Sequence, residues 1–485
     1  MRLSKMINKT RCSQLCIMHC ALCIVAATLL TGCGLYTKYE RPDVNTEGLV
    51  RDPLNPNDTL SVGRIIDGQW TAVSGQDENF GNMPWRSVFT DPKLQELIQQ
   101  GLDKNANLLN AALNVKMVEE QLKVAKLAFI PGFTFSPQGT ISSWDGKTTK
   151  AYSLPVTASW SVDLFGNLLN QKRSAQMALL ATKDYQVVVK TNLISNIANL
   201  YYTLLMLDRQ VEIVNNMSDL TKDTWEKMKV MKETKIGYRS TAVQSAEANY
   251  YSVEAQKTDL LRQIREMENS LSLLIGQPAQ AIARSTLEEQ SLPTNLATGV
   301  GIQMLNNRAD VHAAEMQLAG CFYDINTARS RFYPNITISG TGSYTNNNGM
   351  VNPGKILLSA VGSLVQPIFQ HGQIVAGLKV AKMKYEQAYN TWQQSVLAAG
   401  SEVSNALVLY NSSAEKSAIE AKQIEVLQKN VEDTRALMAS SSTTYLEVIQ
   451  AQSSLLSAQL SKVADDFHKM QAVVNLYQAL GGGAE

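Results

Sequence analysis

Proline is missing from two long stretches of this 485-residue chain, from 166 to 277 and from 371 to the C-terminus. Histidine is also scarce, and none of the four histidines stands at metal-ligand spacing from another. The sequence has no Walker lysine, Gly-x-Ser-x-Gly motif or nucleotide-binding glycine loop. A net charge of +1 gives no reason to expect a nucleic-acid partner. We therefore expect neither catalysis nor a metal nor a cofactor.

After the first 32 residues the sequence has only two cysteines, Cys33 and Cys321. We therefore expect no internal disulfide framework. A basic start precedes an apolar stretch of about ten residues, which is too short to span a bilayer and is typical of a secretory signal. Leu30-Thr31-Gly32-Cys33 then matches a bacterial lipobox. We predict a signal peptide over 1–32 and lipidation of Cys33, and Gly34 favours sorting to the outer membrane. The alternative is an ordinary signal followed by an incidental cysteine.

In the proline-free stretches, apolar residues recur at alternating spacings of four and three. Such heptad seams indicate long helices that wind around partners. At 1.5 Å per residue, a helix over 166–235 would be about 100 Å long. Gly237 interrupts the first stretch and indicates a turn between two antiparallel helices. One seam consists of Leu193, Ile197, Leu200, Leu204, Leu207, Val211 and Val214.

The chain repeats itself at an offset of about 203 to 205 residues. Phe129-Ile130-Pro131 returns as Phe332-Tyr333-Pro334, and Leu274-Ile275-Gly276 returns as Ala479-Leu480-Gly481. We expect a tandem duplication of one unit, which contains a helix, two strands and two very long helices. The predicted organisation is an extended N-terminal tether (33–84), a first repeat (85–278), a linker (279–306) and a second repeat (307–485).

The strands are predicted over 133–144, 152–164, 335–345 and 355–369, with apolar and polar residues alternating. Apart from the signal, no apolar run is long enough for a transmembrane helix, and the other structure that crosses lipid is a closed barrel. Four strands cannot close a barrel with a lumen, so these strands predict an oligomer. The alternative is a soluble β-sandwich. The candidate membrane-interface aromatics are Trp144, Tyr152, Trp160 and Tyr344.

Several short motifs together resemble the TolC superfamily, and among its members the OprM/NodT-type outer-membrane lipoproteins of resistance-nodulation-division (RND) efflux pumps. The resemblance implies a mixed α/β, mainly α, membrane protein. It also implies a homotrimer, in which four strands per chain form a twelve-stranded transmembrane barrel on a long α-helical coiled-coil barrel in the periplasm. The motifs are Tyr39-Glu40-Arg41-Pro42 after Cys33, Trp85-Arg86-Ser87-Val88-Phe89, Asn105-Ala106-Asn107-Leu108 and Asn307-Arg308-Ala309-Asp310.

The resemblance further implies that the ends of the helical hairpins contact a periplasmic adaptor protein and form the gate. Relatives often carry an acidic ring near the position of Gln450, so Glu447, one turn away, is the nearest acidic candidate here. The alternative is that these segments are ordinary solvated turns. The implied residues are Gly237, Arg239, Ser240, Thr241, Ser442, Thr443, Glu447 and Gln450.

The function expected from these features is that of a passive exit duct in the outer membrane of a Gram-negative bacterium. It would be lipid-anchored, extend into the periplasm, and work with an adaptor and an inner-membrane RND transporter that supplies the energy. One alternative is the duct of a type I protein secretion system. Another, of a different class, is a lipid-anchored periplasmic coiled-coil scaffold with soluble β tips.

Overall fold

The computed structural model describes residues 36–43, 49–50, 63–66, 69–72, 80–234, 240–291, 296–298, 308–346, 355–440 and 444–484. The chain divides into two compact units. One unit contains Met1–Asp43, Asn114–Lys183 and Ala313–Trp392, and the other contains Val44–Leu113, Asp184–His312 and Gln393–Glu485. Each unit therefore contains segments from both halves of the sequence.

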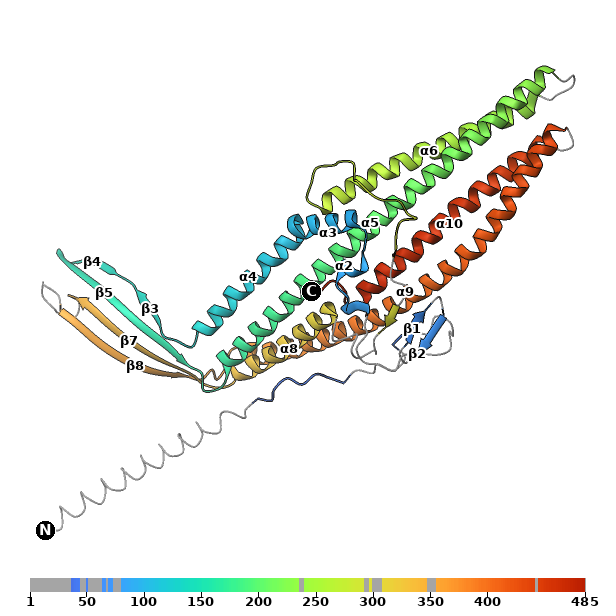
Figure 1. Ribbon diagram of the computed structural model, residues 1–485. Helices are drawn as coiled ribbons and strands as arrows, with labels where there is room; N and C mark the ends of the chain where they lie inside the picture. The colour runs from blue at the N-terminus through green and yellow to red at the C-terminus, as the bar shows by residue number, and fades with distance from the viewer. Residues whose placement is uncertain are drawn as a thin grey trace, which may run out of the picture. The chain divides into compact units, whose positions relative to one another are not determined.

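Long helices form two antiparallel hairpins (Figure 1). The first hairpin consists of α5 (Asn167–Thr234) and α6 (Ser240–Leu274), and the second of α9 (Gln373–Ala439) and α10 (Tyr445–Ala479). Their lengths of 68 and 35 residues in one copy and 67 and 35 in the other match the predicted duplication. The seam positions on α5 that are buried are Leu193, Ile197, Leu204, Leu207 and Val214.

Shorter helices precede each hairpin. Helices α4 (Ala106–Leu127) and α8 (Ala309–Ser330) both have 22 residues and hold equivalent places in the two copies. Helix α3 (Pro92–Lys104) buries Leu94, Leu97 and Ile98, and it begins at an Asp91 N-cap whose carboxylate accepts a 2.9 Å bond from the amide of Lys93. The elements η2 (Phe80–Asn82) and α2 (Trp85–Val88) come before α3.

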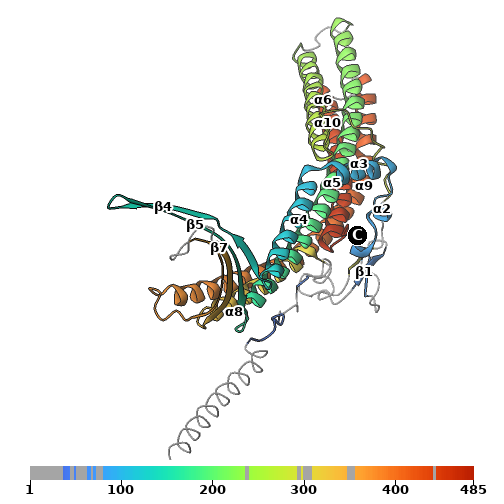
Figure 2. The same ribbon diagram turned by 90° about the vertical axis from the view of Figure 1, so that its left-hand side faces the viewer.

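The larger sheet is antiparallel, with the strand order β3 and β4, then β5, β7 and β8. Figure 2 shows that this sheet is strongly curved. Its strands are β3 (Gly132–Phe135), β4 (Gln138–Trp144), β5 (Lys147–Val162), β7 (Asn335–Thr345) and β8 (Lys355–Val365).

The predicted strand over 133–144 is divided into β3 and β4, so the prediction of one continuous strand was wrong. Phe135 pairs with Val156 and Gln138 pairs with Ser153, which shows that the register continues across the break. The break lies at Pro137, opposite Pro155 and its neighbour, and proline has no amide hydrogen to give to a ladder. Strand β5 begins at 147 rather than 152, and β8 ends at 365 rather than 369, shortly before Pro367.

The two faces of this sheet differ in chemistry. The register places Val156, Gly342 and Leu358 side by side in one row, and Thr157, Thr341 and Ser359 in the next. The apolar face, as we name it, carries Leu154, Val156, Ala158, Trp160, Ile336, Ile338, Tyr344, Ile356, Leu358 and Leu364. The hydroxyl face also carries the apolar residues Pro155, Leu357, Val361 and Val365, but most of its side chains bear hydroxyls, namely Ser153, Thr157, Ser159, Ser161, Thr337, Ser339, Thr341, Ser343, Thr345, Ser359 and Ser363.

A second, three-stranded sheet joins the predicted tether to the predicted linker. Strands β1 (Gly63–Ile66) and β2 (Gln69–Ala72) form a hairpin, and β6 (Leu296–Thr298) pairs with β1. The segment predicted as an extended tether over 33–84 thus includes a short hairpin, which the sequence did not reveal because strands of three or four residues are too short to show a periodicity.

Helices of the described segments do not combine the length and the apolar character that crossing a membrane requires.

Candidate functional site

The free ends of the two hairpins share a small apolar core. Figure 1 shows these ends side by side. Met228 of α5 packs there with Val243 of α6, Met438 of α9 and Val448 of α10, and all four side chains are buried. The two segments that the sequence singled out as hairpin ends are thus joined through one cluster. Its other members are Ala242 and Ala246, with Trp225, Tyr445 and Ile449 packed against them.

Polar contacts connect the hairpins beside this cluster. The carboxylate of Asp223 on α5 accepts hydrogen bonds from Lys227 and, across the hairpins, from Arg435 of α9. The bond from Lys227, with the nearby charge of Arg435, lowers the pKa of Asp223. Gln452 of α10 is buried and donates to Oγ1 of Thr224 at 2.9 Å. Sequence reasoning had not identified Asp223 or Arg435, because nothing local marks contacts between helices so far apart in the chain.

Several of the predicted end residues lie outside the described residues, namely Gly237, Arg239, Ser442 and Thr443. Ser240 and Thr241 are described and begin α6 with exposed side chains. Nζ of Lys232 donates to Oγ of Ser240 at 3.3 Å, which links the last turns of α5 to the start of α6.

Glu447 and Gln450 both lie exposed on α10. Glu447 stands in the first turn of the helix, where a negative charge is favoured by the helix dipole, and it accepts a 3.5 Å bond from Oγ1 of Thr444. Gln450 donates to Oγ of Ser454 at 3.3 Å. A role for either residue in a gate stays a prediction.

An N-terminal strap (residues 36–43) follows the predicted lipidation site, and Cys33 itself lies outside the described residues. The ring of Tyr36 lies so close to Gly166 that a Cβ there would be 3.2 Å away, and Gly166 has a positive φ of 67°. Tyr39 packs edge-on against Phe322 with ring centroids 5.8 Å apart.

The strap also makes an ion pair with α8. Arg41 pairs with Glu315, whose side chain is only 7% exposed. Burial and the negative charge of Glu315 raise the pKa of Tyr39, so its phenol stays neutral. The sequence motif at 39–42 was used only as a family signal, and the structure shows that it holds the chain against the helices.

The predicted interface aromatics lie toward two ends of β5 and β7. Tyr152 and Tyr344 come from neighbouring strands with ring centroids 6.0 Å apart. Trp160, nearer the helices, is 39% exposed and donates from Nε1 to the carbonyl of Phe129 at 3.0 Å. Trp144 is the last residue of β4, and its side chain is outside the described part.

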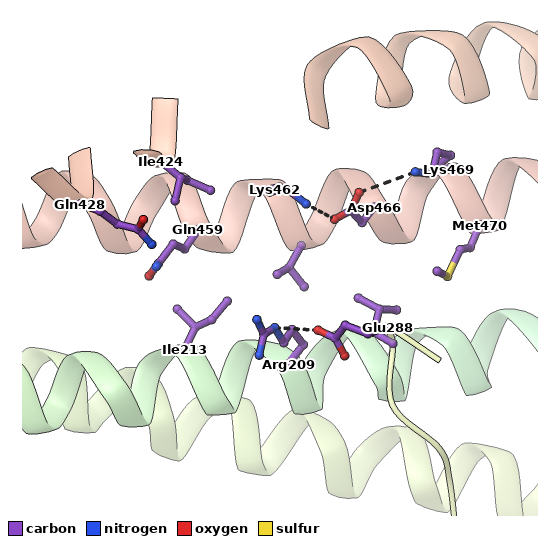
Figure 3. Close-up of a pocket in the computed structure, with 12 residues that line it drawn as sticks. Arg209, Ile213, Glu288, Ile424, Gln428, Gln459, Lys462, Asp466, Lys469 and Met470 are labelled. Carbon is purple, nitrogen blue, oxygen red and sulfur yellow. Dashed lines mark hydrogen bonds and ion pairs between the residues drawn. The ribbon is translucent and has the colours of Figure 1, made fainter. Parts of the chain in front are cut away.

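A groove of about 430 Å³ lies between α5 and the second hairpin, near the segment 287–288 (Figure 3). Its charged side chains are paired, Arg209 with Glu288 at 3.0 Å and Lys462 with Asp466 at 2.6 Å. Apolar side chains fill the space between these pairs. Neither a nucleophile with a base nor a pair of unpartnered carboxylates lines it. The lining residues are Arg209, Ile213, Leu287, Glu288, Ile424, Gln428, Gln459, Lys462, Val463, Asp466, Lys469 and Met470.

Two curated proteins are similar to this chain over nearly their whole length. The cation efflux system protein CusC of Escherichia coli K12 is 26% identical over 469 residues, which cover 94% of this chain and 98% of CusC. The probable outer membrane lipoprotein SilC of Salmonella typhimurium is 26% identical over 476 residues, which cover 95% of this chain and 98% of SilC. Among solved structures, the open MtrE outer membrane channel of Neisseria gonorrhoeae superimposes with a TM-score of 0.79 at 22% identity, over 93% of this chain and 98% of MtrE.

The sequence pattern that describes the family "Outer membrane efflux protein" matches this chain twice, over 97–277 and over 301–482. The two matches confirm the predicted duplication and the predicted superfamily. They also confirm the expectation of a channel component that is not an enzyme. Because the matches together cover well over half of the sequence, the chain belongs to the outer membrane efflux protein family.

Proposed function

We propose that three copies of this chain form the passive exit duct of a tripartite efflux pump in the outer membrane. The observation that carries the proposal is the sheet with two open edges. Within the described chain, β8 pairs on one side only, with β7, and β3 and β4 pair only with β5. Open edges are costly in lipid, and pairing β8 with β3 and β4 of the next copy removes them. Three copies with four strand positions each then close a barrel of about twelve strands.

The aromatic residues support a membrane setting for this sheet. Tyr152 and Trp160 stand eight positions apart on the apolar face of β5, which is about 26 Å at 3.3 Å per residue. Tyr344 lies beside Tyr152. Transmembrane barrels have an outward apolar band about 25 Å tall between two aromatic girdles. At a strand tilt of about 40°, the spacing of about 26 Å along β5 corresponds to about 20 Å of height, so the two aromatic sites lie near the two edges of such a band.

Helix α9 supports assembly of several copies. Leu397, Val408 and Ile419 are 59%, 50% and 58% exposed, and they are spaced by eleven residues. Such a spacing keeps side chains almost in line along a helix. Val426 and Leu437 continue the exposed stripe. An apolar stripe of this length needs a cover, which a second copy of the chain supplies in a trimer.

The hairpin ends are the proposed contact with a periplasmic adaptor, which links the duct to an inner-membrane RND transporter. The exposed side chains of Ser240, Thr241, Glu447 and Gln450 surround the cluster that joins the two hairpins. The same proposal extends to the turn residues between the paired helices, namely Gly237, Arg239, Ser442 and Thr443. The energy comes from the transporter, since the duct carries out no chemistry.

Cys33 is the proposed lipid anchor. Two residues separate it from Tyr36, so its reach from the strap is about 10 Å. The contacts of Tyr36, Tyr39 and Arg41 hold the strap beside the turn at Gly166, where β5 leads into α5, and this supports an anchor at a residue just before the strap. A single acyl chain anchors a protein only weakly, so the barrel supplies the remaining attachment.

Two lysine substitutions on one strand test the proposal. Leu358 and Ser359 are neighbours on β8 but lie on opposite faces, in the rows of Val156 and Thr157. Leu358→Lys faces lipid near mid-depth, and we expect it to cost about 2–4 kcal/mol of membrane-inserted stability. The trimer band in the outer-membrane fraction should be lost for Leu358→Lys and kept for Ser359→Lys. The same outcome for both variants would contradict the proposal, because lipid on one face and water on the other require the two positions to differ.

A further inference from the structure

The hydroxyl groups of the hydroxyl face bond to one another and to backbone carbonyls across the strands. Oγ of Ser153 and Oγ of Ser343 are 2.8 Å apart, and Oγ1 of Thr157 and Oγ1 of Thr341 are 3.0 Å apart. Oγ of Ser363 donates to the carbonyl of Thr337 at 3.3 Å. A hydroxyl has one donor and two acceptor lone pairs, so these contacts leave acceptor capacity for water. Hydrogen bonds therefore hold these side chains in position, and the face can still bind water.

On β7 the hydroxyl face is less exposed than the apolar face, whereas β8 is exposed on both faces in the isolated chain. Ser343 and Thr345 are only 7% and 4% exposed in the isolated chain. On the apolar face of the same strand, Ile338 and Tyr344 are 48% and 38% exposed. Figure 2 shows that the strands of this sheet are bent. When the sheet closes with other copies, the hydroxyl face becomes the wall of the passage.

The wall carries no fixed charge over its central part. Between the row of Ser153 and Thr345 and the row of Ser161 and Thr337, the described strands place no Asp, Glu, Lys or Arg on the hydroxyl face. The charged residues in register with this face are Lys147 and Asp163, which lie beyond those rows, and Lys355, which stands in the outer row with Ser153 and Thr345.

The charges at the ends are too far away to act at the centre of the wall. Ser359 is four positions from Lys355, which is about 13 Å along the strand. The Debye length at physiological salt is about 8 Å. The field of Lys355 is therefore largely screened at Ser359.

We propose that the membrane-spanning passage of the duct has a neutral wall, made mainly of serine and threonine hydroxyls, that admits hydrated solutes of either charge at similar rates. This inference rests on the proposed function, because it needs the hydroxyl face to line a closed passage. The class of solute is set here by size and hydration. Any preference for charge belongs to another part of the duct.

Cysteine labelling from the outside measures the field in this passage without crossing the hairpin ends. The background variant is Cys321→Ser, because Cys321 is a free and partly exposed thiol. Ser359→Cys reports on the hydroxyl face, and Leu358→Cys is the control on the apolar face. Cationic and anionic methanethiosulfonates of similar size are added to intact cells. In each case the cysteine thiolate forms a mixed disulfide and releases methanesulfinate, and rates are divided by those of a small free thiol.

At Ser359→Cys we expect both reagents to react, with a normalised cation-to-anion rate ratio within about threefold of one, since fields that steer ions change on-rates by about tenfold or more. Leu358→Cys should be protected, because a thiol in lipid does not ionise. A ratio beyond about tenfold at Ser359→Cys, with Leu358→Cys protected, would overturn the neutral wall but leave the duct standing. Equal labelling of the two cysteines, or protection of Ser359→Cys, would overturn the proposed function itself.

A charge added to the wall calibrates the same assay. Thr341 lies in the row of Ser359, so Thr341→Asp places carboxylates beside the reporter cysteine in each copy. We expect the cation-to-anion ratio at Ser359→Cys to rise about tenfold in this double variant. An unchanged ratio would contradict the placement of Thr341 on the wall of the same passage.

Discussion

The two repeats secure the ends of their hairpins at the same position but with different side chains. Asn105 and Arg308 each stand directly before the equivalent helices α4 and α8. Nδ2 of Asn105 donates to the carbonyl of Leu274 at 2.9 Å, where α6 ends. Nη1 of Arg308 donates to the carbonyl of Ala479 at 3.0 Å, where α10 ends. Both side chains thus satisfy a carbonyl that the last turn of a helix leaves without an intrahelical partner.

The difference between the two copies lies in charge. Asn105 is neutral, and its Oδ1 accepts bonds from the amides of Asn107 and Leu108, so it also caps α4. Arg308 is 7% exposed, and its charge is balanced by Asp310, which accepts two bonds, and by Glu402 at 2.7 Å. A duplicated position can therefore keep its hydrogen bond while it changes from neutral to ionic, provided that the copy with the cation also supplies carboxylates.

The largest loss of folding stability is expected from Arg308→Ala. The substitution leaves the carbonyl of Ala479 and the carboxylates of Asp310 and Glu402 without their donor. Breaking a buried pair costs about 3–5 kcal/mol, and the exposure of Glu402 favours the lower end of that range. The measurement is the denaturant midpoint of the protein in detergent, with Arg308→Lys as the matched control that keeps the charge. If the free energy of unfolding falls by less than about 1 kcal/mol, the positive charge of Arg308 is not needed to stabilise the second repeat.

Asn105→Ala should cost less, about 1–2 kcal/mol, because it removes neutral bonds only. Asn105→Asp separates the two roles of this side chain, since it keeps the acceptor that caps α4 and removes the donor to Leu274. The same denaturant titration checks both variants. A larger loss for Asn105→Ala than for Arg308→Ala would reverse the comparison between the two copies.

Low pH should weaken the ion pair between Arg308 and Asp310 in the second repeat. Burial opposes ionisation of Asp310, but the hydrogen bonds and charge of Arg308 outweigh it, so the pKa of Asp310 lies below its usual value. A carboxyl with a lowered folded pKa stabilises the protein above its unfolded pKa of about 3.9 and loses that effect as the pH falls through the folded value. Asp310→Asn should therefore be less stable than the parent at pH 7. A stability difference that does not shrink as the pH is lowered below about 4 would contradict this assignment.

The smallest loss of folding stability is expected from a substitution at the other end of the hairpins, Arg435→Gln. Arg435 and Asp223 are 31% and 42% exposed, and Lys227 remains beside Asp223 when Arg435 is changed. Exposed pairs contribute about 0–1 kcal/mol, so Arg435→Gln should lower the free energy of unfolding by less than about 1 kcal/mol. The denaturant midpoint at low and high salt measures this. A loss of about 2 kcal/mol or more would mean that this pair holds the hairpin ends as firmly as Arg308 holds their bases.

The sequence predicted the long helices and most strands because their signals are local and repeated. Alternating apolar positions place β7 at 335–345, and the four-three spacing places Ile197 and Leu204 in the core of α5. The division of β3 from β4 was missed, although Pro137 was visible, because the break depends on the register, which puts Ser136 and Pro137 opposite Pro155 and Leu154 of the neighbouring strand.

The contacts that hold the candidate site were less predictable. Arg308 and Ala479 are 171 positions apart, and Asp223 and Arg435 are 212 apart. Periodicity says that these helices have buried faces, but it does not say which polar residues on neighbouring helices meet. The role of Tyr36 in the strap was hidden for the same reason, since only the fold brings it against Gly166.

The most direct test of the duct is imaging of the full-length protein by electron microscopy, after purification in detergent from the membrane fraction. The account predicts hollow three-fold cylinders more than about 100 Å long, as helices of 67 and 68 residues require, with a detergent belt at one end. Monomers, or rods without a detergent belt, would contradict it. They would remove the barrel and leave a periplasmic coiled-coil scaffold as the better description.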